Sequence, residues 1–173
     1  AIVSSLFLPA ETVHATDYSA WITVAEANWD NLPWTPASPL PGALDDVLDV
    51  SRQPDEGGNV SNTNVYFNSP TIDLKSLGKT NEGTVRFYSG STSTPGDTTL
   101  NISGLLSVSK GGFRFRGDSA STRLTINAGD ILVNNGSIYL GESEAFQNVT
   151  LNVARTTVLT GTTPVIQVGR PTG

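Results

Sequence analysis

The residues that could do chemistry are few in this sequence and widely spaced. The chain has 173 residues with no Cys and one histidine, His14. These counts exclude thiol nucleophiles, thiolate metal sites, disulfides and a zinc centre built from several histidines. A hydrolase triad would have to use His14, and no arrangement of serine and aspartate near it supports one. We therefore predict that the chain is not an enzyme.

One acidic cluster stands out, formed by Asp45, Asp46 and Asp49, with Asp55 and Glu56 shortly after it. Carboxylate and carbonyl oxygens are the ligands that Ca²⁺ prefers, so one interpretation is a calcium site. The other is a solvated turn in which the aspartates accept hydrogen bonds from backbone N–H groups. No cofactor is predicted, and a Ca²⁺ ion held by this cluster is the alternative.

Aromatic and basic residues recur at the centre of four short apolar runs. If these runs stack in register, the four side chains form one exposed column. Such a column suits a glycan, because arginine pairs with the carboxylate of a uronate sugar, and a lyase would also abstract a proton there. The alternative is a Tyr–Arg ladder whose cation–π contacts cover the sheet surface. The four residues are Tyr66, Arg86, Arg114 and Tyr139.

A second column is expected on the first run of each repeat, and it contains a single carboxylate. One carboxylate is too few for a catalytic calcium site, because Ca²⁺ takes about six to eight oxygen ligands. Its expected members are Asp73, Asn101, Thr125 and Thr150.

The elements that carry these columns are short runs in which apolar and polar residues alternate, a pattern typical of β-strands. Comparing the runs reveals an internal repeat of 24 to 25 residues, with three runs in each copy. Glycines separate the runs, at Gly104, Gly111 and Gly117 in one copy and at corresponding places in the next. The matching runs are 100–102, 124–126 and 149–151; 106–108 and 131–133; and 113–115 and 138–140.

Three strands in each repeat are what one coil of a β-solenoid needs, because each strand then pairs with its equivalent one coil away. We predict an all-β parallel β-solenoid (β-helix) of about four to five three-strand coils. A β-sandwich is the alternative, but it does not explain why the third runs match in register. Strands are expected over 72–75, 84–88, 99–103, 105–109, 112–116, 123–127, 131–134, 137–141 and 148–153. Inward columns are expected to include Phe67, Phe87, Phe115 and Leu140.

The sequence divides into three regions. Residues 1–15 are expected to form an apolar arm. Residues 16–44 hold all three tryptophans and several closely spaced prolines, which predicts a Trp/Pro-rich cap. Residues 45–173 carry the solenoid repeats.

Charge and composition limit the partners. The net charge of −6 and the pI near 4.6 argue against nucleic acid or an anionic membrane surface as the main partner. No run of 18 apolar residues is present, so no transmembrane segment is predicted. Ser, Thr and Asn are abundant and charged residues make up only 15% of the chain, which is typical of secreted or cell-surface β-proteins. We expect an extracellular or cell-surface location.

Three features together resemble a known family: Ala27–Trp29, then Pro41–Val47, then Gly-punctuated repeats of the form T-L-x-I-x-x-G-x-L-x-V. Over roughly residues 27–155 the chain is similar to bacterial extracellular proteins with autotransporter-associated β-strand repeats. The resemblance implies a right-handed parallel β-helix at the cell surface, with a scaffold or adhesin-like role. It implies no catalytic residues.

These observations predict an extracellular structural protein that associates with copies of itself as a subunit of a surface filament, appendage or matrix. Association is expected through strand addition or end-to-end stacking, because the C-terminal runs are β-prone and the N-terminal apolar run has no place in the coils. The alternative is a glycan-binding or polysaccharide-processing β-helix module whose partner is an extracellular polysaccharide. The residues expected to mediate self-association are Ile2, Val3, Leu6, Phe7, Leu8, Val165, Ile166 and Val168.

Overall fold

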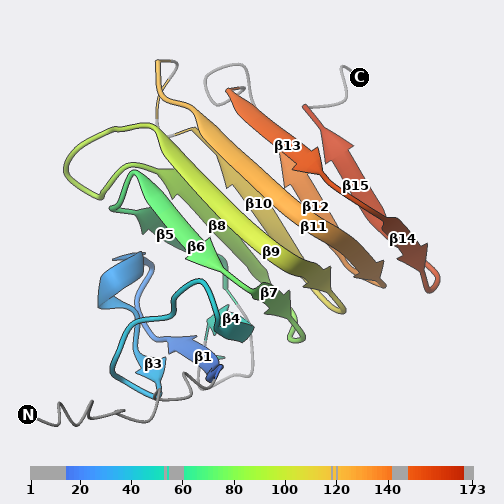
Figure 1. The fold of residues 1–173 in the computed structure, drawn as a ribbon, viewed down its shortest axis with the longest axis horizontal. Coiled ribbons are helices and arrows are strands. Elements are labelled where there is room, and N and C mark those ends of the chain that lie inside the picture. Colours follow the sequence, from blue (N-terminus) through green and yellow to red (C-terminus); the bar gives the residue numbers. More distant parts are fainter. Residues whose placement is uncertain are drawn as a thin grey trace, which may run out of the picture.

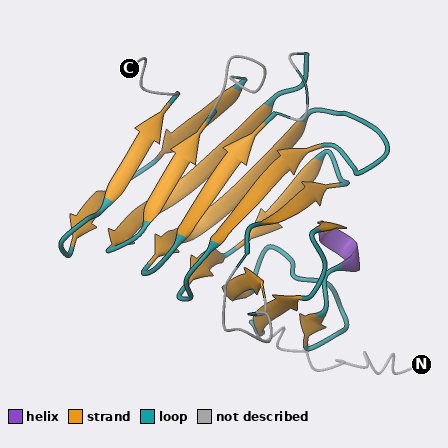
Figure 2. Cartoon of the chain, turned by 180° about the vertical axis from the view of Figure 1, so that it is seen from behind, coloured by secondary structure: helices purple, strands orange, loops and turns teal. Residues whose placement is uncertain are grey.

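The computed structural model describes residues 15–52, 54, 61–117, 119, 121–141 and 148–169. Its regular structure is almost entirely β, with one short 3₁₀ turn, η1 (Trp29–Asn31). Two sheets lie face to face, and the chain winds from one to the other in about five turns (Figures 1 and 2). The predicted parallel β-solenoid is confirmed. The sandwich is excluded because the strand pairs that build the turns are parallel.

The first sheet, sheet A, has nine strands within the described residues. Its neighbours pair in parallel except β3, which runs antiparallel to β1. The main path has the order β13-β11-β9-β7-β4-β1-β3, with β14 also paired to β11 and β6 also paired to β9. The strands are β1 (Asp17–Ile22), β3 (Trp34–Thr35), β4 (Asp46–Arg52), β6 (Thr71–Leu74), β7 (Ser76–Lys79), β9 (Thr98–Val108), β11 (Leu124–Asn134), β13 (Val149–Val153) and β14 (Thr157–Thr160).

In the part of the chain that the structure describes, the second sheet, sheet B, has six parallel strands in the order β15-β12-β10-β8-β5-β2. They are β2 (Glu26–Asn28), β5 (Thr63–Phe67), β8 (Thr84–Ser89), β10 (Gly112–Arg116), β12 (Ser137–Leu140) and β15 (Val165–Val168). Along these strands buried and less buried residues alternate, so one face of the sheet meets the core and the other faces outward.

The division of each coil into strands differs from the prediction. The runs expected at 99–103 and 105–109 form the single strand β9, and those at 123–127 and 131–134 form β11. Gly104 and Gly129 are therefore not corners. The register between β9 and β11 shifts next to Gly129, which marks a β-bulge that bends the sheet without ending the strand. In the turns on either side the same two runs remain separate, as β6 and β7 and as β13 and β14.

The register of the first run also differs from the prediction by two residues. Leu100 lies opposite Ile126 rather than Leu124, and Asn101 lies opposite Asn127 rather than Thr125. A shift of two residues leaves every side chain on the same face of the sheet. The alternating pattern therefore could not reveal it. The pairing of Leu100 with Ile72 is as predicted.

The core lies between the sheets and is built on a stack of phenylalanines. The rings of Phe67 and Phe87 stack at 5.1 Å, and those of Phe87 and Phe115 stack at 5.3 Å. All three side chains are fully buried, and Leu140 lies opposite Phe115 at 4% exposure. All four residues face inward as predicted, but a two-residue shift between β5 and β8 places Phe67 opposite Ser89 and Val65 opposite Phe87.

The Trp/Pro-rich region does two things. Its strands β1 and β2 pair in parallel with β4 and β5, so it supplies strands of the solenoid as well as a cap. Its strand β3 covers the outer edge of β1. The indole N–H of Trp34 donates to the carbonyl oxygen of Trp29 at 3.1 Å, and both rings are buried at the end of the core.

Candidate functional site

Three of the four predicted Tyr–Arg residues form one column on the outer face of sheet B. Arg86 in β8, Arg114 in β10 and Tyr139 in β12 lie opposite one another in successive turns. Tyr66 does not belong to this column: it lies opposite Tyr88, and Asn64 lies opposite Arg86. The reason is again a two-residue shift, here between β5 and β8, which keeps Tyr66 facing outward but moves it to the neighbouring column.

That neighbouring column contains two residues that the sequence reasoning missed, Tyr88 and Arg116. Tyr66 stacks on Tyr88 with ring centroids 4.9 Å apart, and Arg116 lies opposite Tyr88 in the next turn. One guanidinium nitrogen of Arg116 donates to the Tyr88 hydroxyl at 3.0 Å. The alternation along 86–88 and 114–116 was the signal that could have identified both, because residues two apart share a face. We call the two columns together the Tyr–Arg face: Tyr66, Arg86, Tyr88, Arg114, Arg116 and Tyr139.

The Tyr–Arg face concentrates positive charge in a protein with a net charge of −6. Partial burial lowers the pKa of Arg116, and the nearby charges of Arg86 and Arg114 lower it further, while Tyr88 opposes the shift. Within the described strands of sheet B, Glu26 is the one carboxylate, and it accepts a hydrogen bond from the Asn64 amide at 3.0 Å. Three guanidinium groups therefore share one face of the sheet.

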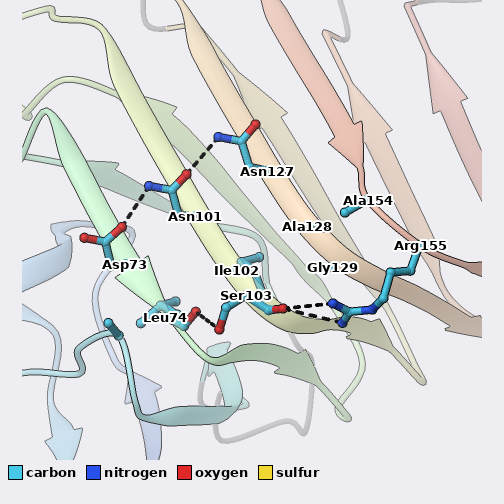
Figure 3. A pocket seen from close by; sticks show the side chains of 11 residues that line it. Asp73, Leu74, Asn101, Ile102, Ser103, Asn127, Ala128, Gly129, Ala154 and Arg155 are labelled. Atoms are coloured by element: carbon cyan, nitrogen blue, oxygen red, sulfur yellow. Dashed lines mark hydrogen bonds between the residues drawn. The ribbon is translucent and has the colours of Figure 1, made fainter.

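The outer face of sheet A carries a ladder of side-chain amides (Figure 3). The amide of Asn101 donates to the carboxylate of Asp73, that of Asn127 donates to Asn101, and that of Asn152 donates to Asn127, each at 2.8 Å. The ladder replaces the column predicted with Thr125 and Thr150, because of the two-residue shift in register. Each amide keeps one N–H and one acceptor lone pair for contacts outside the ladder.

A groove of about 310 Å³ runs beside this ladder, over the bulge in sheet A. Arg155 crosses it, and its guanidinium donates to the Asp130 carboxylate at 2.8 Å. The guanidinium also donates to the carbonyl oxygen of Ser103 at 3.4 Å (Figure 3). A Cβ atom on Gly129 would lie 2.5 Å from that same oxygen, so only glycine fits beneath Arg155. The lining residues are Ala43, Asp73, Leu74, Asn101, Ile102, Ser103, Asn127, Ala128, Gly129, Ala154 and Arg155.

The side chains of the acidic cluster, for which a calcium site was the alternative interpretation, do not converge. The Asp45 carboxylate accepts from the backbone N–H groups of Thr16 and Gly42, at 2.9 and 2.8 Å. Asp46 pairs with Lys75 at 2.6 Å, and Asp49 points into the protein. Asp55 and Glu56 lie outside the described residues. No group of three His, Cys, Asp or Glu side chains in the described ranges could hold a metal ion, so the turn interpretation fits Asp45.

Asp49 belongs to a buried polar network that the sequence did not reveal. Its carboxylate accepts from the Ser51 hydroxyl at 3.0 Å and from the backbone N–H of Thr80 at 3.1 Å. The ammonium of Lys79, a residue only 1% exposed, donates to the Ser51 hydroxyl at 3.2 Å and to the carbonyl oxygen of Glu82 at 3.3 Å. Ser51 and Lys79 are both 1% exposed, so the network lies in the interior of the protein.

Lys79 gives the stability of the fold a pH dependence of defined sign. Burial lowers its pKa below the ordinary 10.5, while the charges of Asp49 and Glu82 oppose the shift. Between the lowered pKa and 10.5 the unfolded chain binds more protons than the folded chain, so this contribution to the free energy of unfolding rises with pH. The difference in unfolding free energy between the wild type and Lys79→Met should therefore increase from pH 7 to pH 10.

Urea unfolding at several pH values measures this difference, and Lys75→Met is the matched control. Lys75 is half-exposed and its hydrogen bond and ion pair with Asp46 raise its pKa. A raised pKa gives a stabilising contribution that is fully present below 10.5 and is lost only as pH rises above 10.5, so the Lys75 difference should stay nearly constant from pH 7 to pH 10. A Lys75 difference that rises over this range as the Lys79 difference does would contradict the assignment.

The residues predicted to mediate self-association are divided between two regions. Val165, Ile166 and Val168 lie in β15, the outermost strand of sheet B, where Val168 is 76% exposed. The N-terminal members of the set, Ile2, Val3, Leu6, Phe7 and Leu8, lie outside the described residues.

Comparisons with family models, curated proteins and solved structures find no match to this chain. Within the described ranges, no helix has the length and apolar character needed to cross a membrane.

Proposed function

We propose that the chain is an extracellular structural protein whose copies associate at the C-terminal edge of the solenoid, formed by β13, β14 and β15. The extracellular location is part of the proposal and is supported by the composition, which is rich in Ser, Thr and Asn and poor in charge. A surface filament, appendage or matrix is the setting that such a subunit fits.

The observation that carries the proposal is a set of inward-facing apolar side chains that are exposed in the last turn that the structure describes. Leu159 is 49% exposed, whereas Val133, opposite it in the preceding turn, is fully buried. Val168 is 76% exposed and its neighbour Leu140 only 4%. The described strands β13, β14 and β15 each pair on one side only. An edge with unpaired backbone groups and exposed apolar residues is a template for another strand.

The other end of the solenoid is covered, by β3 and by the buried rings of Trp29 and Trp34. The two ends of the solenoid therefore differ: one is open and the other is covered. The covered end offers no open strand edge on which the open end of another copy could stack. Strand addition supplies the missing partner, and the apolar run at residues 2–8 is the donor that the sequence offers. A contact between an arm and the opposite end of the next copy does not close and builds a linear polymer.

The test introduces charge at the edge. The double variant Leu159→Lys/Val168→Lys should reduce association, because lysine at an open edge disfavours strand pairing. Val24→Lys, at a residue 51% exposed near the covered end, is the matched control. Sedimentation velocity over a range of concentrations should show assembly for the wild type and the control but not for the double variant. A monomeric wild type, or a double variant that assembles normally with an unchanged circular dichroism spectrum, would overturn the proposal.

Deleting residues 1–9 then distinguishes the two modes. Loss of assembly with a folded monomer remaining supports strand addition by the arm. Unchanged assembly assigns the contact to end-to-end stacking.

Glycan binding is the second candidate function, and one observation favours it. Arg86, Arg114 and Tyr139 form a half-buried column on the outer face of sheet B, and the neighbouring column adds two tyrosines and an arginine. Pull-down on immobilised polysaccharides of different charge tests this candidate.

A further inference from the structure

The outer face of sheet A carries a groove that is longer than the amide ladder beside it. The groove of about 310 Å³ adjoins a second one of about 520 Å³, because Ala43 and Asp73 line both. The second groove continues past Asp73 to the cap, where Trp29 and Asp30 line it. We call the two together the sheet A groove. It crosses successive turns of the solenoid, from the cap to Arg155.

Polar side chains follow this groove at the spacing of the strands. The ladder amides of Asn101 and Asn127 lie one turn apart, a distance of about 4.8 Å between neighbouring strands (Figure 3). A column of threonines runs next to the ladder, two residues earlier on each strand, and so shares its face of the sheet. These threonines lie opposite one another in successive turns: Thr71, Thr99, Thr125 and Thr150. Each of these turns therefore presents a hydroxyl together with an amide or carboxylate.

The charges of the groove favour a neutral ligand. Among the described lining residues Arg155 is the one cation, and its guanidinium is paired with Asp130 at 2.8 Å. Asp30 and Asp73 are exposed carboxylates, so the groove repels an anion, and the net charge of −6 adds to this effect. Hydroxyl groups donate and accept hydrogen bonds as side-chain amides do, and they donate strongly to a carboxylate. The groove therefore suits an uncharged ligand that is rich in hydroxyl groups.

The amide ladder prepares the groove for such a ligand. Asn127 donates to Asn101 and accepts from Asn152, each at 2.8 Å, which fixes the orientation of its amide. A side chain that is already ordered loses little conformational entropy when a ligand binds. Sugar hydroxyls would therefore meet donors and acceptors whose directions are set in advance.

We propose that the sheet A groove binds an unbranched neutral polysaccharide, laid along the solenoid axis. This inference rests on the glycan-binding candidate, and it places the ligand on sheet A rather than on the Tyr–Arg face. The strand spacing of about 4.8 Å is close to the length of one sugar in an extended chain, so successive sugars meet successive turns. Each ladder amide uses its remaining N–H and lone pair for sugar hydroxyls, and the Asp73 carboxylate accepts from another. The small, exposed side chains of Ala43 and Ala154 leave room for a sugar ring and contact its C–H groups.

The experiment measures binding of uncharged linear oligosaccharides to the full chain by isothermal titration calorimetry, with cellohexaose, laminarihexaose and mannohexaose as probes. We expect at least one of them to bind. Asn101→Leu/Asn127→Leu should then weaken binding at least about tenfold, because the hydrogen bonds from two amides are lost. Asn134→Leu is the matched control and should bind like the wild type, since Asn134 is a half-buried residue of the same strand outside the groove lining. The affinity should change little with salt, because the ligand carries no charge.

A second variant tests the groove without altering the ladder. Ala154 is exposed and contributes no side-chain hydrogen bond, so Ala154→Trp should fill the groove and remove binding while the amides keep their contacts. Circular dichroism and urea unfolding check that every variant is folded. Loss of binding in Ala154→Trp therefore reports the groove itself.

The outcomes separate this inference from the candidate on which it rests. If none of the neutral oligosaccharides binds but oligogalacturonate does, glycan binding stands and this inference is overturned. If no oligosaccharide binds, both are overturned. Unchanged binding in either the ladder variant or Ala154→Trp assigns the site to another surface and overturns the inference. An affinity for the neutral probes that falls steeply with salt contradicts it as well.

Discussion

Phe87→Ala should lower the free energy of unfolding by about 3–5 kcal/mol, the range typical of removing a buried aromatic side chain. The expectation rests on the position of Phe87 at the centre of the core. Its ring stacks on Phe67 and Phe115, at 5.1 and 5.3 Å, and meets the edges of Phe113 and Trp29. These partners come from β5, β10 and the N-terminal cap, so one cavity would weaken contacts across several turns.

Equilibrium unfolding in urea, followed by circular dichroism, measures the change. Val24→Ala is the control, because Val24 is 51% exposed and lies away from the proposed association edge, so its truncation should alter the free energy of unfolding by no more than about 0.5 kcal/mol. Phe87→Leu should fall between the two, since it keeps part of the buried volume. A loss below about 1 kcal/mol for the alanine variant would show that the phenylalanine stack does not hold the turns together.

The sequence was sufficient for the architecture because a solenoid repeats its pattern. Alternation fixed which side chains face inward, and the Phe87–Phe115 column follows from it directly. Alternation cannot detect a register shift of two residues, because such a shift leaves every side chain on the same face of the sheet. Leu100 was therefore assigned opposite Leu124 instead of Ile126, and Tyr66 was assigned to the column of Arg86.

The candidate sites were harder to predict because they depend on where side chains point. Asp45, Asp46 and Asp49 are close in sequence, yet one accepts from backbone N–H groups, one pairs with Lys75 and one is buried. The buried network joins Ser51 to Lys79, which are 28 residues apart. Lys79 lies in a polar run, where a lysine is ordinarily exposed, so the local sequence did not indicate that the fold would bury it.

Gly104 and Gly129 show a further limit of the sequence pattern. Glycine between two runs predicts a corner, since corners need conformations that other residues avoid. At these two positions glycine instead allows close approach: a Cβ atom on Gly104 would lie 2.7 Å from the carbonyl oxygen of Lys75. The true corners from sheet A to sheet B lie one run later, at residues with positive φ such as Gly111 (63°) and Asn135 (58°).

Gly111→Ala should lower the free energy of unfolding by about 1–3 kcal/mol, and Gly111→Val by more, for two separable reasons. The first is the left-handed backbone at φ 63°, which side chains disfavour. The second is space, because a Cβ atom would collide with the carbonyl oxygen of Gly83 in the preceding turn and lie 2.8 Å from that of Asn81. Backbone atoms of a stacked turn cannot move aside without disturbing the strand pairs on both sides.

Gly169→Ala isolates the first reason. Gly169 also has a positive φ, of 74°, but a Cβ atom added there would meet no other atom within 4 Å. The extra loss of stability in Gly111→Ala over Gly169→Ala, measured by urea unfolding of the full chain, therefore reports the collision between turns. Asn135→Gly should change the free energy of unfolding little, because glycine keeps the corner and gives up only exposed hydrogen bonds, those from Thr162 to the Asn135 side chain and that from the Asn135 amide to Asn134. Equal effects at Gly111 and Gly169 would mean that the corner conformation alone, and not the tight stacking of successive turns, limits which residues the solenoid accepts there.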